Sequence, residues 1–165
     1  MKSTFILIFC LLIMGVASGQ TYPTTFASLS QHSVYVEAGG PGLYGSLNYE
    51  LQLTDKPKFG LRAGLGYYHH NAKYLTIPLG ANYLFTLEEE KSYIEMGVGV
   101  TFARADGKLR GASTNPDADH FTSYIPSIGY RRHTYDEWIW RIMLTPIINN
   151  FGLSPWLGVS FGKRF

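Results

Sequence analysis

The segment from residue 93 to 104, YIEMGVGVTFAR, alternates between large apolar residues and small or polar residues without interruption. Successive side chains of a β-strand point to opposite faces, so this segment predicts a strand with two chemically distinct faces. One face carries the large apolar side chains, whereas the other carries Glu95, two glycines, Thr101 and Ala103. A carboxylate among glycines suits a soluble core poorly. The pattern instead favours an apolar face toward lipid and a polar face toward a narrow lumen.

The same alternation divides the rest of the chain into strands separated by clusters of glycine, proline and charged residues, such as the tight turn expected at 39–42. The eight predicted strands are 33–38, 44–53, 58–69, 73–87, 93–104, 121–132, 136–148 and 155–165. The connections alternate between short turns on one side and longer loops on the other, of which 105–120 is the longest. This asymmetry is typical of outer-membrane barrels. The sequence therefore predicts an all-β, eight-stranded antiparallel up-and-down transmembrane β-barrel over residues 33–165.

The first 19 residues predict a secretory signal peptide. Lys2 precedes an apolar run at 5–16, and residues 17–19 form a small-residue cleavage site. Cleavage there removes Cys10, the only cysteine, so no disulfide and no thiol chemistry are expected in the mature chain.

Residues 20–32 are then expected to form a short periplasmic segment. An exported chain can enter a membrane as a closed barrel, because closure pairs every backbone group. The expected location is therefore the outer membrane of a Gram-negative bacterium, with outer-membrane lipid around the barrel. The formal net charge of +2 gives no electrostatic basis for binding nucleic acid.

The polar faces of the predicted strands carry charged residues that would point into the lumen. An eight-stranded barrel is just wide enough for its own side chains to fill it. Folding 44–53 against 58–69 places Glu50 opposite Arg62, so we expect an ion pair there, with Glu95 and Arg141 completing a network. The full inward set is Glu37, Glu50, Arg62, Glu95, Arg131, Arg141 and Arg164.

Two interpretations of this charged set are open. One is a selective pore or proton path; the other is a structural plug that satisfies buried charges. We favour the plug because small barrels have interiors filled with side chains. Little or no steady ion conductance is therefore expected.

Other chemistries have weaker support in the sequence. His69, His70 and His120 could approach Asp117 and Asp119, but zinc needs three or four converging ligands, and we predict no metal and no cofactor. A lipid-modifying barrel enzyme would need a serine, a histidine and a carboxylate within reach of one another. No such motif stands in a predicted strand, so we expect no catalytic residues.

A secreted, soluble lipocalin-like barrel that binds an apolar ligand is the main alternative. It shares the alternation but predicts an apolar interior. Here the polar face is rich in Gly, Ser, Asn, Glu and Arg, and the apolar face is broad with aromatic residues near its ends. That composition favours apolar residues toward lipid.

The chain resembles the small eight-stranded outer-membrane β-barrel proteins, the class of the OmpA transmembrane domain and OmpX, which includes PorT-type barrels. The resemblance covers roughly residues 30–165 and rests on the signal peptide, the strand parity and the last strand, where Val159, Phe161 and Phe165 are in step. A terminal aromatic residue on the outward face resembles the signal that barrel-assembly machinery reads, which implies this role for Phe161 and Phe165. Lys163 departs from the apolar residue usual in this series.

The resemblance implies architecture more than activity. It suggests a structural or interaction role through the extracellular loops, in adhesion, envelope integrity or as an accessory to a secretion system. We expect loop 105–120, the longest and most polar, to contact another envelope or extracellular protein.

Overall fold

A computed structural model of the chain describes residues 31–54, 58–70, 72–88, 91–106, 120–150 and 152–165. The predicted signal peptide, most of the predicted periplasmic segment and most of loop 105–120 lie outside the described residues. The elements are β1 (His32–Gly39), the 3-10 turn η1 (Gly40–Gly42), β2 (Gly45–Gln52), β3 (Phe59–His70), β4 (Ala72–Glu88), β5 (Ser92–Asp106), β6 (His120–His133), β7 (Trp138–Leu144), β8 (Ile147–Asn149), β9 (Gly152–Ser154) and β10 (Leu157–Arg164). None of the described residues belongs to a helix long and apolar enough to cross a membrane.

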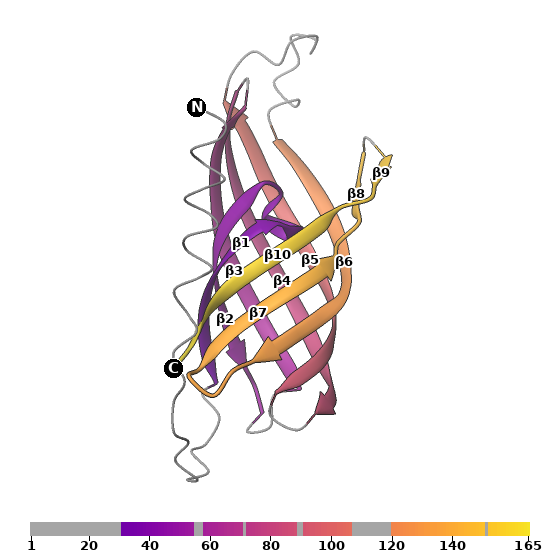
Figure 1. The fold of residues 1–165 in the computed structure, drawn as a ribbon. Coiled ribbons are helices and arrows are strands. Elements are labelled where there is room, and N and C mark those ends of the chain that lie inside the picture. The colour runs from indigo at the N-terminus through magenta and orange to yellow at the C-terminus, as the bar shows by residue number, and fades with distance from the viewer. Residues whose placement is uncertain (1–30, 55–57, 71, 89–90, 107–119, 151) are drawn as a thin grey trace, which may run out of the picture.

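Eight of these strands, β1 to β7 and β10, form a closed barrel in which each strand pairs antiparallel with its neighbours (Figure 1). The barrel closes between the first and the last strand, where Val36 lies opposite Phe161. The predicted eight-stranded antiparallel fold is confirmed. The end of the barrel at which β1 begins and β10 ends is called the lower end, and the opposite end the upper end.

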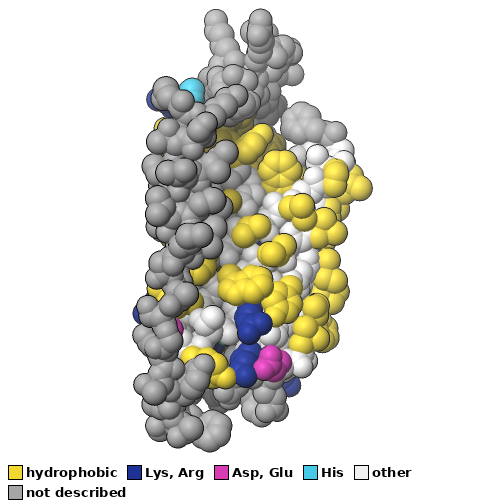
Figure 2. Space-filling view, viewed as in Figure 1, with side chains coloured by type: hydrophobic (Ala, Val, Ile, Leu, Met, Phe, Trp, Pro, Cys, Tyr) yellow, Lys and Arg dark blue, Asp and Glu magenta, His cyan; other side chains and the backbone are white. Residues whose placement is uncertain are grey.

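Alternation along each strand separates the two faces as the sequence predicts. On β1, the side chains of Ser33, Tyr35 and Glu37 are buried inside the barrel, whereas Val34 and Val36 are exposed on the outside. The strand β10 shows the same alternation over its whole length. Figure 2 shows hydrophobic side chains over most of the described surface on the side of β7 and β10, with charged side chains near the lower end.

One wall of the barrel rises above the other at the upper end. The strands β3 to β6 have 12, 17, 15 and 14 residues, whereas β1, β2, β7 and β10 have only 8, 8, 7 and 8 (Figure 1). Proline marks where pairing fades, because it has no backbone N–H to donate. Pro78 lies at a gap in the β3–β4 ladder, between the pairs Ala63–Leu79 and Gly66–Thr76.

One local prediction is wrong, and another is confirmed with a difference in its surroundings. The predicted strand 136–148 ends at Leu144, because Pro146 cannot continue the ladder and the chain instead forms the hairpin β8–β9, which pairs with β6 at Tyr124. The predicted tight turn at 39–42 is the turn η1, and its residues are buried. Gly39 and Gly40 have φ of 73° and 67°, a left-handed conformation that glycine adopts without strain.

Candidate functional site in the barrel lumen

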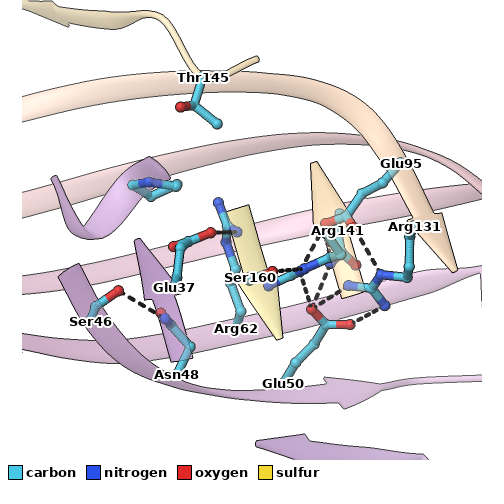
Figure 3. A network of polar contacts seen from close by, with 12 residues as sticks. Glu37, Ser46, Asn48, Glu50, Arg62, Glu95, Arg131, Arg141, Thr145 and Ser160 are labelled. Atoms are coloured by element: carbon cyan, nitrogen blue, oxygen red, sulfur yellow. Dashed lines mark hydrogen bonds and ion pairs between the residues drawn. The ribbon is translucent and has the colours of Figure 1, made fainter. Parts of the chain in front are cut away.

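The lower half of the lumen holds four ionised side chains in mutual contact (Figure 3). Arg131 of β6 binds the Glu50 carboxylate of β2 through both terminal nitrogens, at 2.6 and 2.7 Å, and its Nε donates to Glu95 of β5 at 2.8 Å. From β7, Nη1 of Arg141 reaches Glu50 at 3.1 Å and Glu95 at 3.3 Å. All four side chains are almost completely buried. A bidentate guanidinium–carboxylate pair of this kind fixes geometry as well as charge.

Neutral groups complete this central network. Gln52 donates to Glu50 at 2.6 Å, and the amide of Asn82 donates to both Glu50 and Glu95 at 3.0 and 3.1 Å. The Nε of Arg141 donates to the Ser160 hydroxyl at 2.7 Å, and its guanidinium lies 3.8 Å from the centre of the Tyr35 ring. A cation over an aromatic face and several hydrogen bonds per charge offset part of the desolvation that burial imposes.

The predicted ion pair between Glu50 and Arg62 is wrong, although the register that motivated it is right. The two residues are direct Cα partners on β2 and β3. The Arg62 side chain instead lies over Gly80, where an added Cβ would come within 3.0 Å of its Nε. Its Nη1 faces Glu37 at 3.9 Å, beyond hydrogen-bonding distance. The missing side chain at Gly80 provides the space that lets Arg62 turn away from Glu50.

The remaining predicted residues lie outside the central network. Arg164 lies near the lower end, where its Nη2 contacts Glu137 at 2.9 Å. Phe161 and Phe165 are exposed on the outer surface. Phe161 stacks on Trp138 with ring centres 4.9 Å apart, and Phe165 stacks on His32 at 6.0 Å.

The upper half of the lumen is filled by an apolar cap that the sequence analysis missed. Leu43, which follows η1, packs with Ala103, Ile125 and Ile147, and its carbonyl accepts a hydrogen bond from Nε1 of Trp156 at 3.1 Å. Ile125 and Ala103 stand at inward positions of their strands, so strand parity could have signalled an apolar layer. The inward folding of η1 carries no such signal.

The turn η1 contributes backbone rather than side chains to the filling of the lumen. The Thr101 hydroxyl donates to the Pro41 carbonyl at 2.7 Å, and the Thr76 hydroxyl donates to the Gly42 carbonyl at 3.2 Å. These bonds tie η1 to β4 and β5, on the far side of the lumen from β1. The lumen therefore holds two layers, the ionic network below and the apolar cap with η1 above.

This distribution is the reverse of what the soluble lipocalin-like alternative predicts. The charged and amide side chains lie inside, and the exposed large side chains of the barrel wall are apolar. Among the described residues, no serine hydroxyl is hydrogen-bonded to a histidine. His133, the buried histidine at the lower end, packs its ring 4.8 Å from that of Tyr93. The arrangement can hold charges in place.

Fold and lumen together define a closed eight-stranded barrel with an ionic network and an apolar cap inside and an apolar exterior. No protein-family model matches the chain, and no curated protein matches its sequence. Among solved structures, the chain is similar to the N-terminal β-barrel domain of OprF from Pseudomonas aeruginosa, with a TM-score of 0.64 and 17% sequence identity. The match covers 82% of this chain and 99% of that domain. The resemblance to small eight-stranded barrels is thereby confirmed at the level of the fold.

Proposed function

We propose that the protein is an outer-membrane β-barrel with an obstructed lumen, which acts as a structural or interaction module rather than as an enzyme or a pore. The observation that carries the proposal is the outer surface of the barrel wall. Exposed Leu, Ile, Val, Phe, Tyr and Met side chains cover it on strand after strand. An apolar exterior of this extent far exceeds the patches that soluble monomers expose, and lipid is the environment that suits it.

The two ends of the barrel support an orientation with the lower end toward the periplasm. The lower end carries only connections of six residues or fewer between its strands, whereas the upper end carries the taller wall and the long connection between β5 and β6. Short periplasmic turns and longer extracellular loops are typical of outer-membrane barrels. Interaction with another envelope or extracellular protein through loop 105–120 is part of this proposal.

The tryptophans provide a direct test of the lipid-facing assignment. Trp138 stands on the outer face of β7, whereas Trp156 is half-buried against the apolar cap. Single-tryptophan variants, reconstituted into vesicles of brominated phosphatidylcholine, should show strong quenching for Trp138 and much weaker quenching for Trp156. The folded barrel should also change its gel mobility on boiling. Equal quenching of both residues, or a soluble protein without a mobility shift, would reject the proposal.

The obstructed lumen has its own test. Both layers of the lumen are packed with side chains or backbone, so purified protein in a planar bilayer should give little or no steady current. Stable single-channel currents from the wild-type protein would contradict this part of the proposal. They would leave the membrane location intact.

A further inference from the structure

A groove lies on the outward face of β4, β5 and β6, close to the upper end of the barrel. Its apolar lining consists of Leu75, Ile77, Phe102 and Tyr124, each of which is at least 40% exposed. Its upper lining is polar and includes Arg104, His120 and Asn150. The groove has a volume of about 590 Å³.

The strand register shows how abruptly the chemistry changes along this groove. Arg104 of β5 is the Cα partner of both Leu75 on β4 and His120 on β6. One outward position lower on β5, Phe102 stands between Ile77 and Thr122. Residues two apart on a strand are separated by about 7 Å, so the polar side chains of Arg104 and His120 border the apolar surface within one step.

The groove continues downward along the barrel wall. A second groove of about 540 Å³ shares Phe102 and Tyr124 with the first, and a third of about 520 Å³ shares Val98 and Pro126 with the second. The floor is low here because Ala81, Val98 and Pro126, which are partners across the three strands, have short side chains. The three grooves form one trough, apolar along its length and cationic only at its upper end.

We propose that this trough binds a phosphate-bearing glycolipid with several acyl chains, of the chemical type that lipid A represents. The phosphate would lie at Arg104 and His120, and the acyl chains would lie along Phe102, Val98 and Pro126. Arginine suits the upper end because its planar guanidinium can hold two phosphate oxygens at once. The inference rests on the proposed function, which places the upper end in the outer leaflet.

The width of the trough favours several acyl chains over one. It spans β4, β5 and β6, and adjacent strands are about 4.8 Å apart, so the trough is about 10 Å wide. That width accommodates chains side by side. The polar row also spans two strands, since Arg104 and His120 are Cα partners. Phosphatidylglycerol, which has two chains and a single phosphate, should therefore bind more weakly.

The test measures lipid binding to the folded full-length mature chain by native mass spectrometry, with lipid A and phosphatidylglycerol as separate ligands. The double variant Arg104→Gln/His120→Gln removes the Arg104 charge and the His120 imidazole, and Val98→Trp fills the trough without touching either residue. Arg132→Gln is the matched control for charge, because Arg132 is exposed on the neighbouring strand β6 at the lower end. Val159→Trp on β10 is the matched control for bulk, since Val159 is exposed on the outer face away from the trough.

Lipid A should bind the wild type at least about tenfold more tightly than phosphatidylglycerol. Both trough variants should bind lipid A about tenfold more weakly than the wild type, the effect of one charge-assisted hydrogen bond or more. The two controls should bind lipid A as the wild type does. Dephosphorylated lipid A should bind the wild type weakly, and Arg104→Gln/His120→Gln should change that affinity little. Equal binding of the two lipids, or undiminished binding by the trough variants, would overturn the inference.

The mobility shift on boiling is recorded for every sample, which separates this inference from the proposed function. A wild-type protein that shifts normally but binds both lipids alike refutes only the trough. A wild-type protein that neither inserts nor shifts refutes the membrane barrel itself. All four variants alter outward side chains, and a normal shift for each confirms that the comparison is between folded barrels.

Discussion

The central ionic network makes a sharp prediction for Glu50→Gln. The Glu50 carboxylate is fully buried and accepts five hydrogen bonds, three from the guanidinium groups of Arg131 and Arg141 and two from the amides of Gln52 and Asn82. Glutamine keeps the shape of the side chain but removes its charge. It also replaces one acceptor oxygen with an NH2 group that faces donors. Arg131 would then retain only Glu95 as a carboxylate partner within the network.

The expected cost follows from the burial of the partners. Removing one member of a buried ion pair leaves the opposite charge uncompensated and typically destabilises a protein by about 3–5 kcal/mol. The matched control is Glu37→Gln, since Glu37 is also buried inside the barrel but lies 3.9 Å from Arg62 and accepts no side-chain hydrogen bond. We expect the control to cost less than Glu50→Gln, because no side-chain hydrogen bond is lost and the amide oxygen can still face Arg62.

Denaturant unfolding of the barrel in lipid vesicles, followed by tryptophan fluorescence, measures both free energies of unfolding by linear extrapolation. The double variant Glu50→Gln/Arg131→Gln should show a coupling energy of at least about 2 kcal/mol, since the two residues share a bidentate contact. The reasoning fails if Glu50→Gln costs less than about 1 kcal/mol, or if the two single glutamate variants destabilise the barrel equally.

Three further predictions concern the assembly signal, the position of η1 and the apolar cap. Phe165→Ala should slow insertion by the assembly machinery several-fold in a time course of the mobility shift. Phe85→Ala, which is also exposed on the outer face, should not slow it. Equal insertion rates for the two variants would show that Phe165 is not an assembly signal. Gly158→Ala should destabilise the barrel by about 1–3 kcal/mol in denaturant unfolding, because its Cβ would lie 2.7 Å from the Cα of Gly40. The control Gly45→Ala meets no atom closer than 3.6 Å and should be nearly neutral. A neutral Gly158→Ala would show that η1 can shift freely. Trp156→Ala should remain without steady current in a planar bilayer but should conduct when combined with Glu50→Gln/Arg131→Gln; conduction by Trp156→Ala alone would show that the ionic network does not obstruct the lumen.

The fold was predictable because its signal is local. Side chains of a strand alternate with a period of two, so the parity of each strand can be read from that strand alone. The inward positions of Glu50, Glu95, Arg131 and Arg141 follow from this parity, and the structure brings these four together. The seventh strand was overestimated because its alternation continues past Leu144, whereas Pro146 ends the pairing.

The choice of partners inside the lumen was not predictable from neighbouring strands. Arg131 and Glu50 belong to β6 and β2, which are not adjacent in the barrel, and meet only because their side chains cross the lumen. Such a contact depends on the barrel's diameter and on how far each strand is displaced along its neighbour. Adjacent-strand reasoning therefore selected Arg62 as the partner of Glu50. The pairing of neighbouring strands does not show that the missing side chain of Gly80 lets Arg62 lie elsewhere.

The proposed obstruction of the lumen rests on two layers, one apolar and one ionic. The apolar cap and η1 restrict water from the upper end, which lowers the local polarity around the network and strengthens each of its contacts. The same low polarity makes an unpaired charge costly, so the network is stable only while its carboxylates and guanidinium groups stay matched. Opening either layer alone leaves the other in place. We therefore infer that a conducting state requires the cap to move and the ion pairs to separate together, two changes that neither layer favours by itself.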